Sequence, residues 1–232
     1  MVNQTNQRKL IWTLQNSFEK ETNSYPLISK FNFIHKPLIN LNFNSNYKKI
    51  KSEIKKYQNI IITSPYAAEK TVNLINCLTH DIYAVGKKSN DIFIKSNFKV
   101  IKNFQVSQDM SNWIRQNSKD KFIHLCSDMS DSEIWSSNVD SFPFYFPTEN
   151  KEIDKNFIKK TTNSIVVFGS PSGVKVWFDN QTHDNGNSFV CMGLTTANKI
   201  KDYTDKDVIY PPDSRLSTLI DLLNGKEKLY EK

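Results

Sequence analysis

Two Ser-Pro pairs stand directly after apolar runs of strand length, and this arrangement predicts anion binding. Ser64-Pro65 follows the run 59–62, and Ser170-Pro171 follows the run 165–168. Serine is a favoured helix N-cap, and proline fits the first helical position because no backbone N–H is needed there. Each pair is therefore expected where a strand ends and a helix begins. The free N–H groups and the dipole of a helix start favour negatively charged ligands.

A glycine loop follows each Ser-Pro pair at nearly the same distance along the chain. Gly86 comes 22 residues after Ser64, and Gly193 comes 23 residues after Ser170. Glycine permits a tight turn, and the hydroxyl groups that follow it are expected to cap the next helix. The loops read Gly86-Lys87-Lys88-Ser89 and Gly193-Leu194-Thr195-Thr196. The serines and threonines could serve simply as caps, and the lysines as a solvated pair, so these alternatives stay open.

The order of these features predicts an α/β fold built twice. Each glycine loop precedes another apolar run, at 98–101 and 207–210, and then a helical pattern, at 111–114 and 217–223. Strands that alternate with helices imply a parallel sheet flanked by helices in each chain half. In such sheets ligands bind beyond the carboxyl ends of the strands. An earlier helix is expected from Asn16 or Ser17 until Pro26.

Two extended segments separate the repeated parts. Residues 39–43 alternate apolar side chains with asparagine, and residues 142–147 alternate phenylalanine with Pro143, Tyr145 and Pro147. Proline at every second position suits an exposed edge or a short ladder, and alternation points Tyr145 away from the phenylalanines. We expect linker strands at 38–43 and 141–146. They would join one lobe of residues 1–37 with 147–232 to a second lobe of residues 44–140.

Charge and composition exclude several classes of protein. The net charge is +7, but 28 of the 31 basic residues are lysine, and asparagine occurs 26 times. Proteins that read nucleic acid favour arginine for bidentate contacts, so we expect no nucleic-acid partner. We expect most of the lysines to be solvated surface residues. The alternative is that together they create a positive electrostatic field that attracts a polyanionic ligand. No apolar run approaches the ~20 residues of a membrane helix or forms a signal-peptide core, so no membrane partner is expected.

Metal, nucleotide and nucleophile motifs are missing from the sequence. The six glycines do not spell GxGxxG or GxxxxGK[ST], and neither HExxH nor GxSxG occurs. The four histidines are scattered, and the four tryptophans are read as packing residues. The three cysteines are widely spaced and never form CxxC, which indicates a reducing, cytoplasmic location without disulfides or a zinc site.

Taken in order along nearly the whole chain, these segments resemble the uroporphyrinogen-III synthase family. The resemblance rests on Phe168–Val174, Met192–Ala197, their counterparts Ile62–Pro65 and Ala84–Gly86, and the returning strand around Tyr145. It implies two α/β lobes with a cleft between them, joined by a two-stranded linker. It also implies a lyase of haem biosynthesis that cyclises hydroxymethylbilane to uroporphyrinogen III with inversion of ring D. The family uses neither metal nor cofactor.

The resemblance also implies roles for individual residues. Tyr145 would protonate the departing hydroxyl of the substrate, a linear tetrapyrrole with many carboxylates; its alternative role is that of an ordinary strand tyrosine. A monomeric protein is expected. The substrate-binding residues implied by the resemblance or by their loop positions are Ser64, Lys87, Lys88, Ser170, Ser172, Thr195 and Thr196.

Two departures from the family pattern keep a second interpretation open. Where many members carry a glycine and basic residues after a strand, this chain has the acidic stretch 127–133. Where the family often has arginine after its first strand, Leu14 and Gln15 stand here. Both changes remove positive charge from positions expected to face the substrate. The alternative is a catalytically degenerate bilobed relative that binds a small polyanionic ligand.

Overall fold

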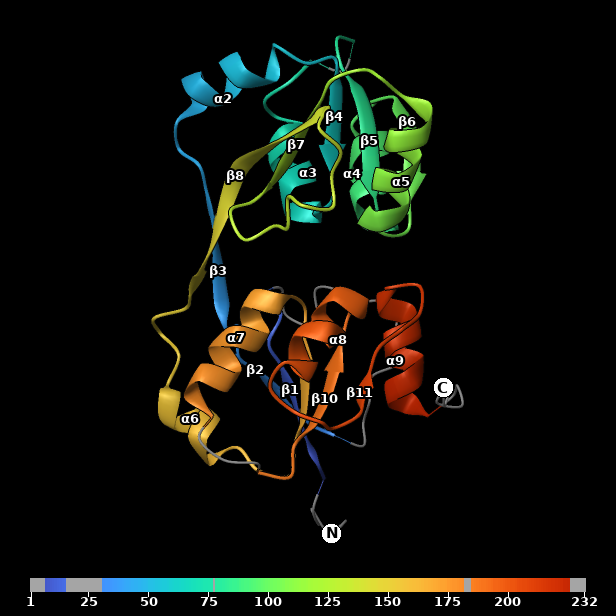
Figure 1. The fold of residues 1–232 in the computed structure, drawn as a ribbon. Helices are drawn as coiled ribbons and strands as arrows, with labels where there is room; N and C mark the ends of the chain where they lie inside the picture. Colours follow the sequence, from blue (N-terminus) through green and yellow to red (C-terminus); the bar gives the residue numbers. More distant parts are fainter. Residues whose placement is uncertain (1–6, 16–30, 77, 182–184, 226–232) are drawn as a thin grey trace. The chain divides into compact units, whose positions relative to one another are not determined.

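The structure is a computed structural model, and it describes residues 7–15, 31–76, 78–181 and 185–225 (Figure 1). The chain divides into two compact units, residues 1–40 with 148–232 and residues 41–147. The expected linker strands at 38–43 and 141–146 fall at β3 (Ile39–Phe43) and in β8 (Val139–Glu149). The helix expected between residues 16 and 26 lies outside the described residues, as do Cys77 and His183.

The first unit is a parallel sheet with helices on both faces. Its strand order is β11-β10-β9-β1-β2, and all four pairings are parallel. The strands are β1 (Lys9–Trp12), β2 (Asn32–His35), β9 (Ile165–Phe168), β10 (Ser188–Cys191) and β11 (Val208–Ile209). The helices are α6 (Lys155–Lys160), α7 (Pro171–Asn180), α8 (Leu194–Lys201) and α9 (Leu216–Asn224).

Burial on both faces explains why the strands of this unit read as continuous apolar runs. Every residue of β9 is buried. Val167 packs with Trp12 and with Leu219 of α9 on one face. Phe168 contacts the ring of Trp177 from α7 on the other, with the centroids 6.0 Å apart. The expectation that the tryptophans are packing residues is confirmed for Trp12 and Trp177, which are fully buried.

The second unit is a six-stranded sheet in the order β3-β8-β7-β4-β5-β6. Its other strands are β4 (Asn59–Ile62), β5 (Asp81–Val85), β6 (Val100–Phe104) and β7 (Phe122–Ser127). Its helices are α2 (Tyr47–Ile54), α3 (Pro65–Thr71), α4 (Lys87–Lys95) and α5 (Ser107–Asn117). Side chains of α2, α3 and α4 pack on one face of the sheet with Ile60 and Leu125. Those of α5 pack on the other face with Ile61 and Phe122. The α/β class predicted from the sequence is confirmed.

Strand β8 corrects the prediction of an exposed edge, because it lies between β3 and β7. Its parallel register with β7 passes from Cys126 opposite Pro143 to Ser127 opposite Tyr145. Phe144 is therefore an extra residue, and the strand bulges there. On the β3 side, the N–H of Asn44 donates to the carbonyl of Phe144 at 3.1 Å. The bulge interrupts the ladder next to Pro143, which allows proline in a strand that pairs on both sides.

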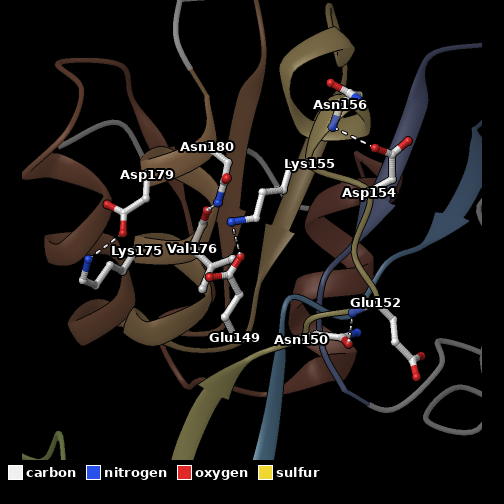
Figure 2. Close-up of polar contacts among 10 residues, drawn as sticks. All are labelled: Glu149, Asn150, Glu152, Asp154, Lys155, Asn156, Lys175, Val176, Asp179 and Asn180. Atoms are coloured by element: carbon white, nitrogen blue, oxygen red, sulfur yellow. Dashed lines mark hydrogen bonds and ion pairs between the residues drawn. The ribbon is translucent and has the colours of Figure 1, made fainter.

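Beyond β8 the chain enters α6 through a polar turn, which Figure 2 shows. Asp154 is the N-cap of this helix, and its carboxylate accepts the N–H of Asn156 at 2.9 Å. The Lys155 ammonium lies 3.2 Å from the Glu149 carboxylate at the end of β8. This pair is exposed and adds little stability, so the cap is what defines where α6 begins.

The buried side-chain amide of Asn187 allows a test of what stabilises the first unit. The Asn187 side chain is 2% exposed; it accepts the N–H of Ser164 at 3.0 Å and donates to the carbonyl of Thr161 at 3.1 Å. Asn187→Ala should lower the free energy of unfolding by about 2–3 kcal/mol, because two buried backbone groups lose their partner. Asn180→Ala is the control, since its amide donates to the Val176 carbonyl within α7, on a partly exposed surface. Equal losses in denaturant unfolding would contradict this account.

Candidate functional site

The turns that follow β9 and β10 lie at the same edge of the first unit's sheet. The two strands are neighbours, and the N–H of Met192 after β10 donates to the carbonyl of Phe168 at 3.1 Å. The structure therefore brings the predicted residues Ser170 and Ser172 to the same edge as Thr195 and Thr196. This is the carboxyl end of a parallel sheet, where two helices begin side by side.

Ser170 caps α7 as its sequence context predicts. Its hydroxyl accepts the N–H of Gly173 at 3.4 Å, and Pro171 occupies the first helical turn. The Ser172 hydroxyl lies 3.0 Å from that of Ser170. Both serines are partly exposed, so their hydroxyls and the remaining N–H groups of the first turn are open to a ligand.

The α8 turn differs from its prediction. Gly193 is the N-cap, and the described residues provide no side-chain hydrogen bond to this helix start. A Cβ at Gly193 would lie 2.6 Å from the Ser214 hydroxyl oxygen, so glycine is needed here for close approach of another loop. Thr195 is exposed, whereas Thr196 is 5% exposed and its N–H donates to the Gly193 carbonyl. Of the two threonines, Thr195 is the one whose hydroxyl reaches solvent.

Ser64 in the second unit has a different partner from its counterpart Ser170. It occupies the N-cap position of α3, but its side chain caps no described N–H of that helix. Its hydroxyl instead lies near the phenol of Tyr145 and lowers the pKa of that phenol. The expected side-chain cap is thus wrong for Ser64. Two of the predicted site residues, Ser64 and Tyr145, are brought close together.

The environment of Tyr145 changes the acidity of its phenol. Burial raises its pKa above the usual value, the nearby Ser64 hydroxyl opposes the shift, and the carboxylate of Asp128 adds to it. The ring packs on the same core cluster as Phe144 and Phe142, which differs from the alternation expected of a regular strand. The bulge at Phe144 breaks that alternation. Tyr66 of α3 meets the ring at 5.2 Å between centroids and 64°.

Lys87 and Lys88 occupy the first turn of α4 with exposed side chains. The turn is made possible by Gly86, whose φ of 81° is left-handed. The Lys87 ammonium lies 2.7 Å from Asp91, and this hydrogen bond lowers the pKa of that carboxyl. The expected hydroxyl cap does not form, since the buried Ser89 hydroxyl has no partner among the described residues.

A buried histidine that sequence reasoning did not single out lies behind the β4–α3 turn. His124 of β7 is 2% exposed, and its Nε2 lies 3.0 Å from the Thr63 hydroxyl. The Trp135 ring meets it edge-on, with the centroids 4.9 Å apart. Burial lowers the pKa of His124 to about 3, so the imidazole is neutral. One histidine in an apolar strand gives no signal in sequence, because its neighbours come from distant segments.

Metal ligation finds no support in the described part of the chain. No three histidine, cysteine or acidic side chains among the described residues lie close enough to hold a metal ion. Cys126 and Cys191 are free and buried, and burial raises the pKa of each thiol to about 11. Within the same residues, no helix has both the length and the apolar character needed to cross a bilayer.

Comparison with known proteins decides the family. The family model described as uroporphyrinogen-III synthase HemD matches residues 29–221. The chain belongs to the uroporphyrinogen-III synthase family. A search of curated proteins gave no match.

Solved structures of uroporphyrinogen-III synthases share the fold. The enzyme from Helicobacter pylori 26695 aligns with a TM-score of 0.63 at 13% identity, over 95% of this chain and 100% of that one. A mutant uroporphyrinogen III synthase from the extremely thermophilic bacterium Thermus thermophilus aligns with a TM-score of 0.59 at 10% identity, over 95% and 100%. At these identities the likeness concerns the fold, and the site residues rest on the geometry described above.

The neutral His124 predicts a pH dependence of stability. Its folded pKa of about 3 lies below the unfolded value of about 6.5, so the unfolded chain binds more protons as the pH falls. The His124 contribution should fall by about 2 kcal/mol between pH 7 and pH 5. His124→Gln should remove this part of the slope in urea unfolding at the two pH values. An unchanged slope in the variant would show that His124 binds protons equally in the folded and unfolded states, and would contradict the lowered pKa.

Proposed function

We propose that this family member is an active uroporphyrinogen-III synthase, which converts hydroxymethylbilane to uroporphyrinogen III with inversion of ring D. The observation that carries the proposal is the position of the Tyr145 phenol, which is partly buried and meets the ring of Tyr66 at the start of α3. A phenol keeps its proton at neutral pH and can give it to a leaving hydroxyl. We assign Tyr145 as the general acid of this reaction.

The carboxylates of the substrate need several anchors. In the first unit, α7 and α8 begin side by side at the carboxyl end of the sheet and expose Ser170, Ser172 and Thr195. Helix starts of this kind favour carboxylates through free N–H groups and the helix dipole. Lys87 and Lys88 of the second unit supply exposed positive charge. We assign these residues, with Ser64, to substrate binding; Thr196, whose N–H is bonded to the Gly193 carbonyl, shapes the turn that presents Thr195.

The reaction mainly requires the protein to position the two ends of the substrate. Loss of the terminal hydroxyl gives an azafulvene cation, ring D attacks through its substituted carbon, and the resulting spiro intermediate fragments and closes the other way. The bound chain must hold both ends of the tetrapyrrole near each other, which removes an entropic barrier. It must also keep water from the cation. Tyr145 supplies the proton, and the helix starts and lysines hold the carboxylates.

Several further expectations belong to this proposal. The reaction eliminates water, so the enzyme is a hydro-lyase, and the residues assigned above need no cofactor for it. We propose that residues 38–43 and 141–146 link two lobes, that the protein acts as a cytoplasmic monomer, and that it binds no nucleic acid.

A catalytically degenerate relative that binds a small polyanion is the second candidate. It is favoured by the acidic segment after β7, where Asp128, Asp131 and Glu133 are exposed. It is favoured also by Lys87, whose charge is partly neutralised by Asp91. Such a protein would bind a polycarboxylate and leave its chemistry unchanged.

Isomer analysis separates the two candidates. Hydroxymethylbilane closes unaided to the type I isomer, so catalysis appears as type III product. With the purified protein and freshly made hydroxymethylbilane, chromatography should show type III as the main isomer. Type I alone, even at high protein concentration, would refute the synthase and favour the binding protein.

Tyr145→Phe tests the general acid. The variant keeps the ring and its packing, so fold and product binding should stay nearly unchanged while turnover falls. General acid catalysis is typically worth about 10²–10⁴-fold, and a loss of about 10-fold is expected here because the hydroxyl also leaves unaided. Tyr57→Phe is a matched control: it removes a phenol hydrogen bond to Asp140 at the other end of β8. Full activity of Tyr145→Phe would assign proton donation to another group.

A further inference from the structure

Tyr66 is a second tyrosine, which lies beside Tyr145, and a hydrogen bond fixes the position of its own phenol. It is the residue after Ser64-Pro65, in the first turn of α3. Its phenol donates a hydrogen bond to the carbonyl of Leu41 in β3 at 2.9 Å. Burial raises the pKa of this phenol, so the donor keeps its proton. The hydrogen bond ties the start of α3 to β3.

The ammonium of Lys70 lies over the face of the Tyr66 ring. Lys70, one turn further along α3, places its ammonium 5.3 Å from the centroid of Tyr66 and 5.9 Å from that of Phe43. Cations in this position are attracted to the aromatic face. The Tyr66 ring is thus restrained at its hydroxyl by Leu41 and over its face by Lys70. It then meets the Tyr145 ring at 64°.

The ring of Tyr145 is only partly buried. It packs on the core cluster that contains Phe144, and it also meets the ring of Tyr66. Edge-to-face contacts of this kind favour a definite arrangement of the two rings. A restrained Tyr66 therefore restrains the orientation of the Tyr145 ring.

We propose that Tyr66 is a positioning residue that fixes the ring of Tyr145 in the geometry required for proton donation. This inference rests on the proposed function, because it assumes that Tyr145 is the general acid. A misplacement of about 1 Å in a catalytic group costs up to about 100-fold in rate, so a fixed ring is worth preserving. Tyr66 itself touches no reacting atom in this scheme.

Two substitutions separate the hydrogen bond from the ring. Tyr66→Phe keeps the ring and loses the bond to Leu41, and it should lower kcat by about 3-fold. Tyr66→Leu also loses the ring contact, and it should lower kcat by about 10-fold while KM changes less than about twofold. Tyr57→Phe is again the control and should match the wild type. Loss confined to KM, or variants as active as the control, would overturn the proposal.

A double-mutant cycle tests whether Tyr66 acts through Tyr145. In the Tyr145→Phe background the hydroxyl to be positioned is gone, so adding Tyr66→Leu should not lower kcat further. If the two losses multiply instead, Tyr66 acts independently of the general acid and the inference is wrong.

A readout without turnover keeps this test separate from the proposed function. With ¹³C-labelled tyrosine, the ring signal of Tyr145 is identified in NMR spectra by its disappearance in Tyr145→Phe. Tyr66→Leu should shift this signal and speed flipping of the ring, and Tyr57→Phe should leave it unchanged. An unaltered signal in Tyr66→Leu overturns the positioning role even if the enzyme is active. A wild-type protein that forms type I product alone refutes the synthase instead, and the ring signal still reports the contact.

Discussion

The bulge in β8 is the constraint on which the proposed role of Tyr145 depends. A regular strand would place Phe144 and Tyr145 on opposite faces of the sheet. Because Phe144 is an extra residue against β7, both rings pack on the face covered by α3. Tyr145 therefore meets Tyr66 of α3 and lies near Ser64. Without the inserted residue, its ring would lie on the face covered by α5.

The same Ser-Pro construction is used in two ways. Ser170 caps its helix, and its partly exposed hydroxyl lies within hydrogen-bond distance of the Gly173 N–H and of the Ser172 hydroxyl. Ser64 caps no described N–H of its helix and lies near Tyr145 of β8. The same sequence pattern therefore gives two different local arrangements, and the roles proposed above for the two turns rest on that difference.

Local chemistry made much of the fold predictable from the sequence. Apolar runs such as 59–62 and 165–168 are buried strands, and Ser-Pro marks the helix starts that follow them. What failed depends on pairing between distant segments. Neither the bulge opposite Ser127 nor the position of β8 between two strands can be read from alternation in one strand. The contact of His124 with Thr63 and Trp135 is likewise made by residues far apart in sequence.

Charge near Tyr145 has two opposing effects on a polycarboxylate substrate. The acidic segment after β7 repels carboxylates, and the exposed Asp128 belongs to it. The same carboxylate raises the pKa of Tyr145, together with burial, and so favours the protonated phenol. A cation that develops when the hydroxyl departs would be stabilised by that negative charge. Binding energy for the carboxylates must then come from other positions, and the exposed helix starts of α7 and α8 are suited to provide it. Under the proposed function, the loss of basic residues after β7 weakens the attraction of carboxylates to that segment and at the same time favours the protonated phenol of Tyr145.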